Sequence, residues 1–398
     1  MARFEPFRGT TYRADIPARD VLAPPYDVVD PSEREVLASR SPYNSILVEL
    51  PLDRGGGDRY AHAASLFGSW HDEGVVKVSD EPVFYVYRMT FTEEDGTVRA
   101  TTGVLGALFL DPYQRGDVLP HEQTTSKDKT DRLSLLGAAR ANFSPIWGLS
   151  LAAGLGKLCA GATSAGETFG ARDDDGVLHE RWVVASSELI EEISALVASA
   201  PVLVADGHHR YETACAYLAG EGAGTRGADA ILAFVVELAE DELAVQGIHR
   251  LVEGVPAAAV LEGLERWFEP SPGPDDPGLL AEAMLEAGGL GLVMPDRNLL
   301  LVARPELLAS VADDLDTSRL GFALEASLPG AKVSFQHGIG ASRAAVLTGR
   351  ASAAVLVRPV SIEQIESTAN GGRRMPPKST FFHPKPRTGA VFRELDAS

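Results

Sequence analysis

Hydrophobic residues recur along the chain with two spacings, one typical of helices and the other of strands. The clearest helical spacing lies at residues 60–70, where apolar side chains fall on one face, and Gly74 marks the end of this helix. A capping box of Ser32 and Glu35 predicts the start of another short helix, which ends before Ser41. Further amphipathic stretches predict helices over residues 131–141, 188–199, 210–219 and 279–287.

Short apolar runs without helical spacing predict strands. One of them, residues 202–205, leads directly into a glycine turn. Two alternating stretches, residues 230–237 and 242–247, predict a hairpin. The other predicted strands cover residues 83–89, 101–110, 290–294, 299–302 and 354–358. Since helices and strands are mixed throughout, the predicted fold class is α+β.

The chain has 398 residues, a length that suggests more than one domain. Residues 270–278 contain four prolines, which fix the backbone and lack amide donors. We therefore expect a linker there, between a main domain of residues 1–269 and a C-terminal segment of residues 279–398. The alternative is a long surface loop within one domain.

The charge narrows the range of partners. The chain contains 36 Lys and Arg against 56 Asp and Glu, which gives a formal net charge of −20. Proteins that bind nucleic acids or membrane surfaces need a basic face, so the charge argues against both partners. A local basic patch can still hold one anionic small molecule.

Two observations concern the compartment. Cys159 and Cys215 are too few for a disulfide framework, which is typical of a reducing cytoplasm. The N-terminal residues lack the apolar core of a signal peptide, and the most apolar stretch, residues 194–205, is shorter than the ~20 residues that a bilayer requires. We therefore expect a cytoplasmic protein without a membrane partner, and a homo-oligomer is compatible with the sequence.

The strongest candidate site follows one of the predicted strands. Asp206 and Gly207 form a turn, and His208, His209 and Arg210 occupy the start of the next helix. The amides at a helix N-terminus bind phosphate readily, and an arginine can hold a phosphate through two hydrogen bonds. Histidines donate hydrogen bonds or move protons near neutral pH. Asp206 has the chemistry to cap the helix, to hold Mg²⁺ or to act as a base.

Two other interpretations of this turn are open. Asp206 can serve only as a helix cap, with the histidines as polar surface residues. Alternatively, His208 and Glu212, four residues apart on a helix, can ligate a metal ion, although the sequence lacks the separate third ligand of the usual zinc motif.

A second candidate lies in the polar loop that opens residues 120–142. Glu122 is a candidate base or Mg²⁺ ligand, and Lys127 is a candidate phosphate ligand. The alternative is a solvated charged loop.

Two further motifs carry polar groups near the ends of the chain. One is a basic cluster near the C-terminus: Arg373, Arg374, Lys378, Lys385 and Arg387. Lys378, Ser379 and Lys385 can donate to an anion there, with Thr380 beside Ser379; the alternative is an extended packed tail. Near the N-terminus, a diproline presents Tyr26 and Asp27, a pair that can bind a small polar substrate or form a structural turn.

These motifs together resemble one known family. The chain contains, in this order, PFRGTTY, APPYDVV, HEQT, KTDRLSLLGAARANFSPI, ADGHHRYETA and MPPKSTFFHPKP. On these motifs it is identified as a member of the bacterial and archaeal family catalogued as domain of unknown function 1015. This resemblance covers nearly the whole chain and implies no activity.

The turn itself is similar to the Asp-Gly-His-x-Arg motif of ParB-like free-serine kinases, and to turns of sulfiredoxins and ParB nucleotidases. The resemblance implies a ParB/sulfiredoxin-like nucleotide-binding core within a larger mixed α/β chain. It also implies that Asp206 lies near the transferred group or metal and that an upstream glutamate, Glu122 or Glu49, acts as base. His208 replaces the sulfiredoxin cysteine, which argues against sulfinic-acid repair.

The resulting hypothesis is a kinase that uses ATP or ADP, with Mg²⁺, to phosphorylate a hydroxyl of a small polar molecule such as serine or a hydroxy acid. Its catalytic residues are Asp206, which also ligates Mg²⁺, His209 and Glu122. Its nucleotide-binding residues are Gly207, His208, Arg210, Lys127, Lys378 and Ser379. Its substrate-binding residues are Tyr26, Asp27 and Thr380. The alternatives are a phosphohydrolase or nucleotidase that uses the same turn, and a nucleotide-binding regulator without catalysis.

Overall fold

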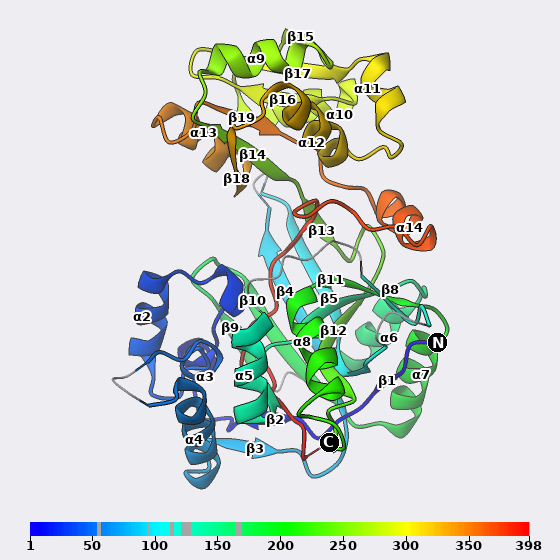
Figure 1. The fold of residues 1–398 in the computed structure, drawn as a ribbon. Coiled ribbons are helices and arrows are strands. Elements are labelled where there is room, and N and C mark those ends of the chain that lie inside the picture. Colours follow the sequence, from blue (N-terminus) through cyan, green and yellow to red (C-terminus); the bar gives the residue numbers. More distant parts are fainter. Residues whose placement is uncertain (54–56, 94–95, 112–114, 121–128, 164–168, 398) are drawn as a thin grey trace. The chain divides into compact units, whose positions relative to one another are not determined.

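The computed structural model describes residues 1–53, 57–93, 96–111, 115–120, 129–163 and 169–397, and its fold is mixed α+β, as predicted (Figure 1). The chain forms two compact units. The first contains Met1–Leu243 and Pro384–Ser398, and the second contains Ala244–His383. The predicted boundary at residues 270–278 thus differs from the division in the structure, because these residues lie inside the second unit.

The prolines of residues 270–278 are accommodated without a linker. Strand β15 (Phe268–Pro272) lies at one end of the sheet order and pairs with β17 (Asn298–Ala303). An edge strand tolerates proline because an amide on its open side needs no partner. Asp276 then caps helix α10 (Pro277–Ala287), in which proline occupies the first turn.

A nine-stranded sheet lies at the centre of the first unit. Its buried strands follow from their sequences, since β12 is almost entirely Val, Ile, Leu, Ala and Phe. Strand β1 (Phe4–Glu5) pairs with β5 beside the main path. Along that path the order is β6 (Val118–Pro120), β11 (Val202–Asp206), β8 (Ile146–Ser150), β12 (Ala230–Glu237), β5 (Val98–Phe109), β4 (Phe84–Thr92), β10 (Leu178–Val184) and β9 (Phe169–Arg172).

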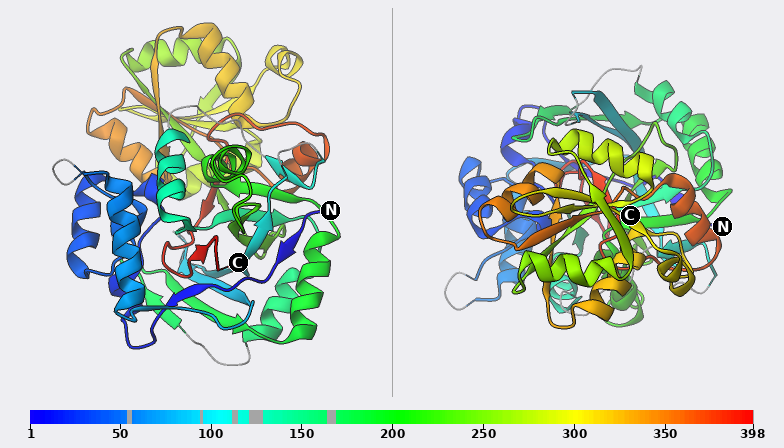
Figure 2. Two further views of the ribbon diagram at one scale, coloured as in Figure 1. Left: turned by 60° about the horizontal axis from the view of Figure 1, so that its bottom comes forward. Right: turned by 90° about the horizontal axis from the view of Figure 1, so that it is seen from above.

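Helices cover this sheet and form its hydrophobic cores. Helices α6 (Leu155–Ala162), α7 (Ser187–Ala198) and α8 (His208–Ala219) share one core with the strands, and Figures 1 and 2 show α6 and α7 together. Helix α8 also packs beside α5 (Lys129–Ala139), which contacts α4 (Arg59–Asp72). In a second core, the ring of Phe67 from α4 lies 5.2 Å from that of Phe392, so the C-terminal residues are built into the unit.

The remaining elements of the first unit are short. They are β2 (Thr10–Tyr12), α1 (Ala18–Val21), η1 (Tyr26–Val28), α2 (Pro31–Arg40), α3 (Ile46–Glu49), β3 (Val76–Val78), β7 (Ala141–Asn142) and β21 (Arg393–Glu394). The cap of α2 differs from the predicted one. Asp30 accepts hydrogen bonds from the amides of Ser32 and Glu33 at 2.8 and 2.9 Å, so Asp30 is the N-cap.

The second unit contains a six-stranded antiparallel sheet with the order β15, β17, β16 (Leu290–Val293), β19 (Ala353–Leu356), β14 (Ile248–Glu253) and β18 (Lys332–His337). Its other helices are α9 (Ala257–Glu265), α11 (Pro305–Ser310), α12 (Asp316–Ser327), α13 (Ile339–Leu347) and α14 (Ile362–Asn370). Strand β13 (Ala244–Gln246) pairs with β20 (Phe381–His383), whereas β12 pairs with β5 and β8. The predicted hairpin of residues 230–237 and 242–247 is therefore wrong, because long-range pairing replaces pairing between neighbours.

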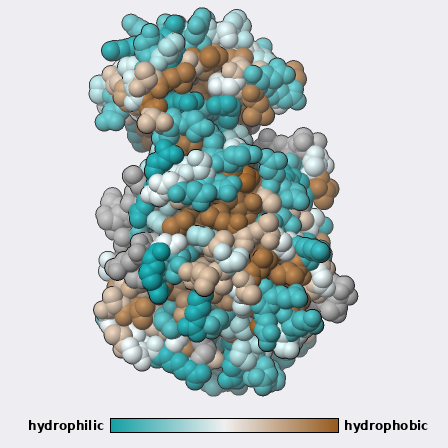
Figure 3. All heavy atoms as spheres, turned by 90° about the vertical axis from the view of Figure 1, so that its right-hand side faces the viewer, coloured by the Kyte–Doolittle hydropathy of each residue, from teal (hydrophilic) through white to brown (hydrophobic). Residues whose placement is uncertain are grey.

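The surface of the described residues carries both hydrophobic and hydrophilic side chains. On the face in Figure 3, brown hydrophobic areas are broken up by hydrophilic residues. Among the described helices, none combines the length and the apolar character that crossing a membrane requires.

Candidate functional site

The turn after β11 joins a buried strand directly to a helix, as predicted. Strand β11 ends at Asp206, Gly207 has a φ of 83°, and α8 begins at His208. A β carbon at position 207 would lie 3.0 Å from both Arg210 Nε and Ile146 Cγ2. Both the backbone conformation and the close packing therefore require glycine.

Replacing this glycine tests the turn. We expect Gly207→Ala to lower the free energy of unfolding by about 1–2 kcal/mol, because alanine is strained at positive φ and would displace Arg210. Thermal or urea denaturation measures the change. The matched control is Gly68→Ala within α4, where nothing lies within 4 Å of an added β carbon and alanine is favoured by about 1 kcal/mol. Equal stability of the two variants would contradict the role of Gly207.

Asp206 lies between two cations. Its Oδ2 accepts a hydrogen bond from Arg210 Nη2 at 3.2 Å, and its Oδ1 accepts one from Lys385 Nζ. Burial raises the pKa of this carboxyl, but the charges of Lys385 and Arg210 outweigh burial and hold the pKa of Asp206 well below its usual range. Asp206 is therefore ionised at neutral pH and accepts a proton only weakly.

Arg210 links the turn to polar residues from other segments of the first unit. Its Nη1 donates to Ser144 Oγ at 2.9 Å and to the Pro145 carbonyl at 2.6 Å. Ser144 Oγ in turn donates to Glu49 Oε1 at 2.9 Å, and Arg132 Nη1 lies 3.6 Å from the same oxygen. Glu49 is 3% exposed. A buried carboxylate thus lies one hydroxyl group away from the arginine of the turn.

A small cavity of about 50 Å³ lies against this network. Its polar lining comes from Glu49, Arg132, Asn142, Ser144, Arg210 and Thr213. Two buried polar atoms here, Arg210 Nε and Thr213 Oγ1, have no hydrogen-bond partner among the described residues. A cavity of this size and polarity can hold water or a hydroxymethyl group.

The N-terminal diproline loop reaches the same network. The ring of Tyr26 lies 4.2 Å from the guanidinium carbon of Arg132 and 6.0 Å from that of Arg210. Burial raises the pKa of Tyr26 to about 12, so the phenol is neutral and can donate a hydrogen bond. The exposed Asp27 acts on Arg210 through its charge: burial lowers the pKa of Arg210, but Asp27 and Asp206 raise it overall. Tyr26 and Asp27 therefore belong with the turn.

The other predicted site residues fall into three groups. His208 and His209 are half-buried in the first turn of α8. Lys378, Ser379 and Thr380 belong to the second unit, so their contribution to this site stays a prediction. The predicted site residues Glu122 and Lys127 lie outside the described residues.

Within the second unit, the segment around Ser379 is locally fixed. Ser379 Oγ lies 2.9 Å from Thr317 Oγ1 and donates to the Pro376 carbonyl at 2.7 Å. Lys378 is exposed and has a φ of 60°. The hydroxyl of Ser379 is therefore buried and held by local contacts, whereas Lys378 lies at the surface of the second unit.

Four residues of this site could not be assigned to it from the sequence. Lys385 appeared only as part of a basic cluster, and Glu49 only as one of two possible bases. Ser144 and Arg132 were not singled out. The available signal for Lys385 was its position between two prolines, which fix the direction in which the chain presents it.

The described residues around Asp206 do not fit a metal ion held by the protein. Both carboxylate oxygens of Asp206 face cations. Within the described ranges, no three His, Cys, Asp or Glu side chains come together as a metal-binding group.

The family described as protein of unknown function (DUF1015) matches residues 4–318 of the chain. The curated proteins include no match. Among solved structures, the chain is similar to free serine kinase in complex with AMP, with 14% identity, coverage of 67% of this chain and 83% of that one, and a TM-score of 0.37. It is similar also to C-terminally truncated SbnI from Staphylococcus aureus, with 14% identity, coverage of 71% of this chain and 85% of that one, and a TM-score of 0.40. A conserved hypothetical protein from Pyrococcus furiosus has 13% identity, coverage of 68% of this chain and 88% of that one, and a TM-score of 0.38.

Proposed function

Because the chain belongs to the DUF1015 family, whose description names no activity, we propose a function from the site itself. The protein is a phosphotransferase that moves a phosphoryl group from ATP or ADP to the hydroxyl of a small polar molecule. The observation that supports this most is the turn at Gly207, which brings an aspartate, an arginine and a distant lysine to the start of a helix.

The charges of the turn suit a nucleotide phosphate. Arg210 and Lys385 both contact the carboxylate of Asp206 at the start of α8, where the positive end of the helix dipole and the first-turn amides favour an anion. The protein as a whole carries a formal net charge of −20, so two cations gathered at one helix N-terminus stand out against its composition. The similarity of the turn to the free-serine kinase motif supports the same assignment.

Transfer needs an attacking hydroxyl, a leaving nucleotide and a proton acceptor. The acceptor oxygen bonds to the terminal phosphorus, the bond from that phosphorus to the bridging oxygen breaks, and ADP leaves from ATP or AMP from ADP. The hydroxyl proton passes to a carboxylate. Asp206 is a poor choice because its pKa is held low. Glu49 is the better one, since it is buried, lines the small cavity and already accepts a hydroxyl hydrogen bond from Ser144.

The same geometry also favours a second candidate, a phosphohydrolase. The cavity beside Glu49 has room for water as well as for a hydroxymethyl group. Water activated at that place would release free phosphate from the nucleotide.

Phosphorus NMR of the full chain separates these candidates. ATP and ADP are supplied separately, with and without MgCl₂, and with and without a pool of serine, threonine, hydroxy acids and polyols. We expect a new phosphomonoester signal that requires an acceptor and is lost in Asp206→Asn. Release of free phosphate without any acceptor would replace the kinase by the phosphohydrolase. Nucleotide binding without turnover in any mixture would contradict both enzymes and leave the regulator.

A further inference from the structure

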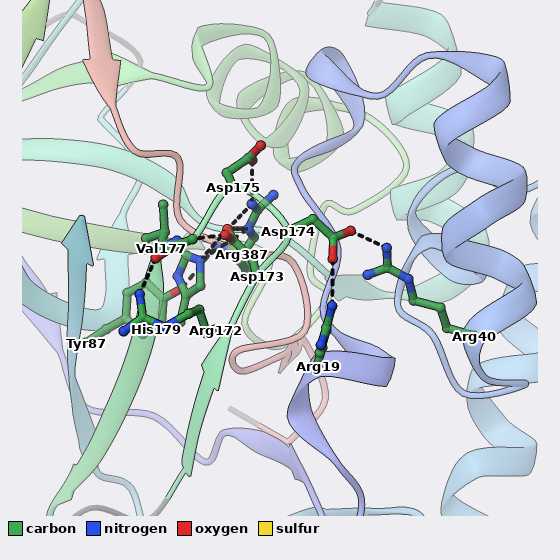
Figure 4. Close-up of polar contacts among 11 residues, drawn as sticks. Arg19, Arg40, Tyr87, Arg172, Asp173, Asp174, Asp175, Val177, His179 and Arg387 are labelled. Atoms are coloured by element: carbon green, nitrogen blue, oxygen red, sulfur yellow. Dashed lines mark hydrogen bonds and ion pairs between the residues drawn. The ribbon is translucent and has the colours of Figure 1, made fainter. Parts of the chain in front are cut away.

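A closed ring of polar contacts fixes Arg387, two residues beyond Lys385 (Figure 4). The amide of Arg387 donates to Tyr87 Oη at 3.2 Å, and Tyr87 Oη lies 2.7 Å from His179 Nδ1. His179 Nε2 lies 2.9 Å from Asp173 Oδ2. The same oxygen accepts from the Arg387 guanidinium, through Nε at 3.0 Å and through Nη2. The contacts therefore begin at the main chain of Arg387 and end at its side chain, and we call this closed set of contacts the Arg387 ring.

Each hydrogen bond of the Arg387 ring can be assigned one donor and one acceptor. Burial lowers the pKa of His179 despite its contact with Asp173, so the imidazole is neutral. His179 Nε2 lies 2.9 Å from Asp173 Oδ2 and 3.3 Å from Arg387 Nε. Because the nearer carboxylate is ionised, we assign the imidazole proton to Nε2, which leaves Nδ1 to accept from the Tyr87 hydroxyl. Burial raises the pKa of Asp173, but His179 and Arg387 outweigh burial and hold it well below its usual range. Every member has a matched partner, which makes the ring rigid.

The chain between this ring and the site is short and stiff. Lys385 stands between Pro384 and Pro386, whose rings fix φ. On the other side, Thr388 exchanges two backbone hydrogen bonds with Ala23, at 2.9 and 3.2 Å. Arg387 and Thr388 therefore anchor the main chain on the C-terminal side of Lys385, and the two prolines restrict its path at Lys385 itself.

We infer that the Arg387 ring is a positioning device, which sets Lys385 against Asp206 and so completes the phosphate-binding turn. Tyr87 and His179 are fully buried, and the side chains of Asp173 and Arg387 are 15% and 10% exposed. The ring acts through Lys385 and not by contact with a nucleotide. This inference rests on the proposed function only for the consequence at the nucleotide; the placement of Lys385 is testable without it.

The first experiment measures Lys385 itself. The full chain is treated with a small amine-acetylating reagent at neutral pH, and the acetylation rate of Lys385 is followed by mass spectrometry. We expect the rate to rise at least about tenfold in Asp173→Asn, because an ammonium released from its ion pair with Asp206 becomes accessible to the reagent. Tyr87→Phe opens the ring without leaving a charge unpaired, and it serves if Asp173→Asn does not fold. Thermal denaturation confirms that each variant is folded.

The same loop offers the matched control. Asp174 contacts Arg19 Nη2 at 3.2 Å and also Arg40, outside the ring (Figure 4). Asp174→Asn should leave the acetylation rate of Lys385 unchanged. If the ring variants lower the melting temperature but leave Lys385 as slow to react as in the parent protein, the ring is only a structural tie and the inference is wrong.

The second experiment tests coupling to the nucleotide. The Kd for ATP is measured for Asp173→Asn, for Lys385→Met and for the double variant. If the ring acts through Lys385, adding Asp173→Asn to Lys385→Met produces no further loss of affinity. Additive losses would overturn the inference even if ATP binds. Absence of ATP binding, together with faster acetylation in the ring variants, would instead contradict the proposed function and leave the positioning of Lys385 intact.

Discussion

The Glu49→Gln variant is expected to lose phosphoryl transfer, with kcat lower by roughly 10²–10⁴-fold. Glutamine can still accept the hydrogen bond from Ser144 Oγ, but it cannot take a proton from the acceptor hydroxyl. The loss should therefore fall on kcat, with little change in the affinity for nucleotide. Steady-state rates measured with the acceptor identified by phosphorus NMR give the answer.

The control for this variant is Glu33→Gln on α2, at an exposed position of the same unit, which should keep the parent rate. Retention of the full rate by Glu49→Gln would remove Glu49 as the base. Glu122, the other upstream glutamate, would then become the next residue to replace.

The Arg210→Ala variant is expected to have the largest effect on stability. It leaves Asp206, whose side chain is 18% exposed, with one cation in place of two and removes the donor to Ser144 Oγ and the Pro145 carbonyl. Removing one partner of a buried ion pair typically lowers the free energy of unfolding by about 3–5 kcal/mol. Urea denaturation measures the loss. Arg19→Ala is the control, since its surface pair with Asp174 contributes at most about 1 kcal/mol.

The effect of Arg210→Ala also has a defined pH dependence. The folded pKa of Asp206 is lowered, so its ion pairs stabilise the protein above the unfolded pKa and lose this contribution as pH falls toward the folded value. The difference in stability between parent and variant should therefore shrink below about pH 4. A difference that grows on acidification would contradict the assignment.

The turn could be predicted from the sequence because all of its determinants are local. A run of apolar residues specifies the buried strand, Gly207 permits the left-handed conformation, and the following residues continue as a helix. The N-cap of α2 is Asp30, two residues before the predicted Ser32. Both residue types have side chains that can cap a helix, so the sequence does not distinguish them, and the path of the backbone decides between them.

The rest of the site depends on contacts between distant segments. Lys385 and Asp206 are 179 positions apart, and Ser144 and Glu49 are 95 apart. Charge and spacing do not determine which lysine meets which carboxylate over such separations. The wrong hairpin has the same origin, because β12 finds its partners in β5 and β8 rather than in the next stretch of chain.

The order in which the units occur in the chain also has a consequence during protein synthesis. Residues 384–398 complete the first unit but are made only after the whole of the second. At about 5–20 residues per second, a ribosome needs on the order of 10–30 s to make the intervening segment. During that time the first unit lacks Phe392 and Arg393, whose side chains are fully buried in its interior. The nascent chain therefore has its glycine turn well before it has Lys385, and a ribosome that stalls before Pro384 holds a chain with an incomplete site.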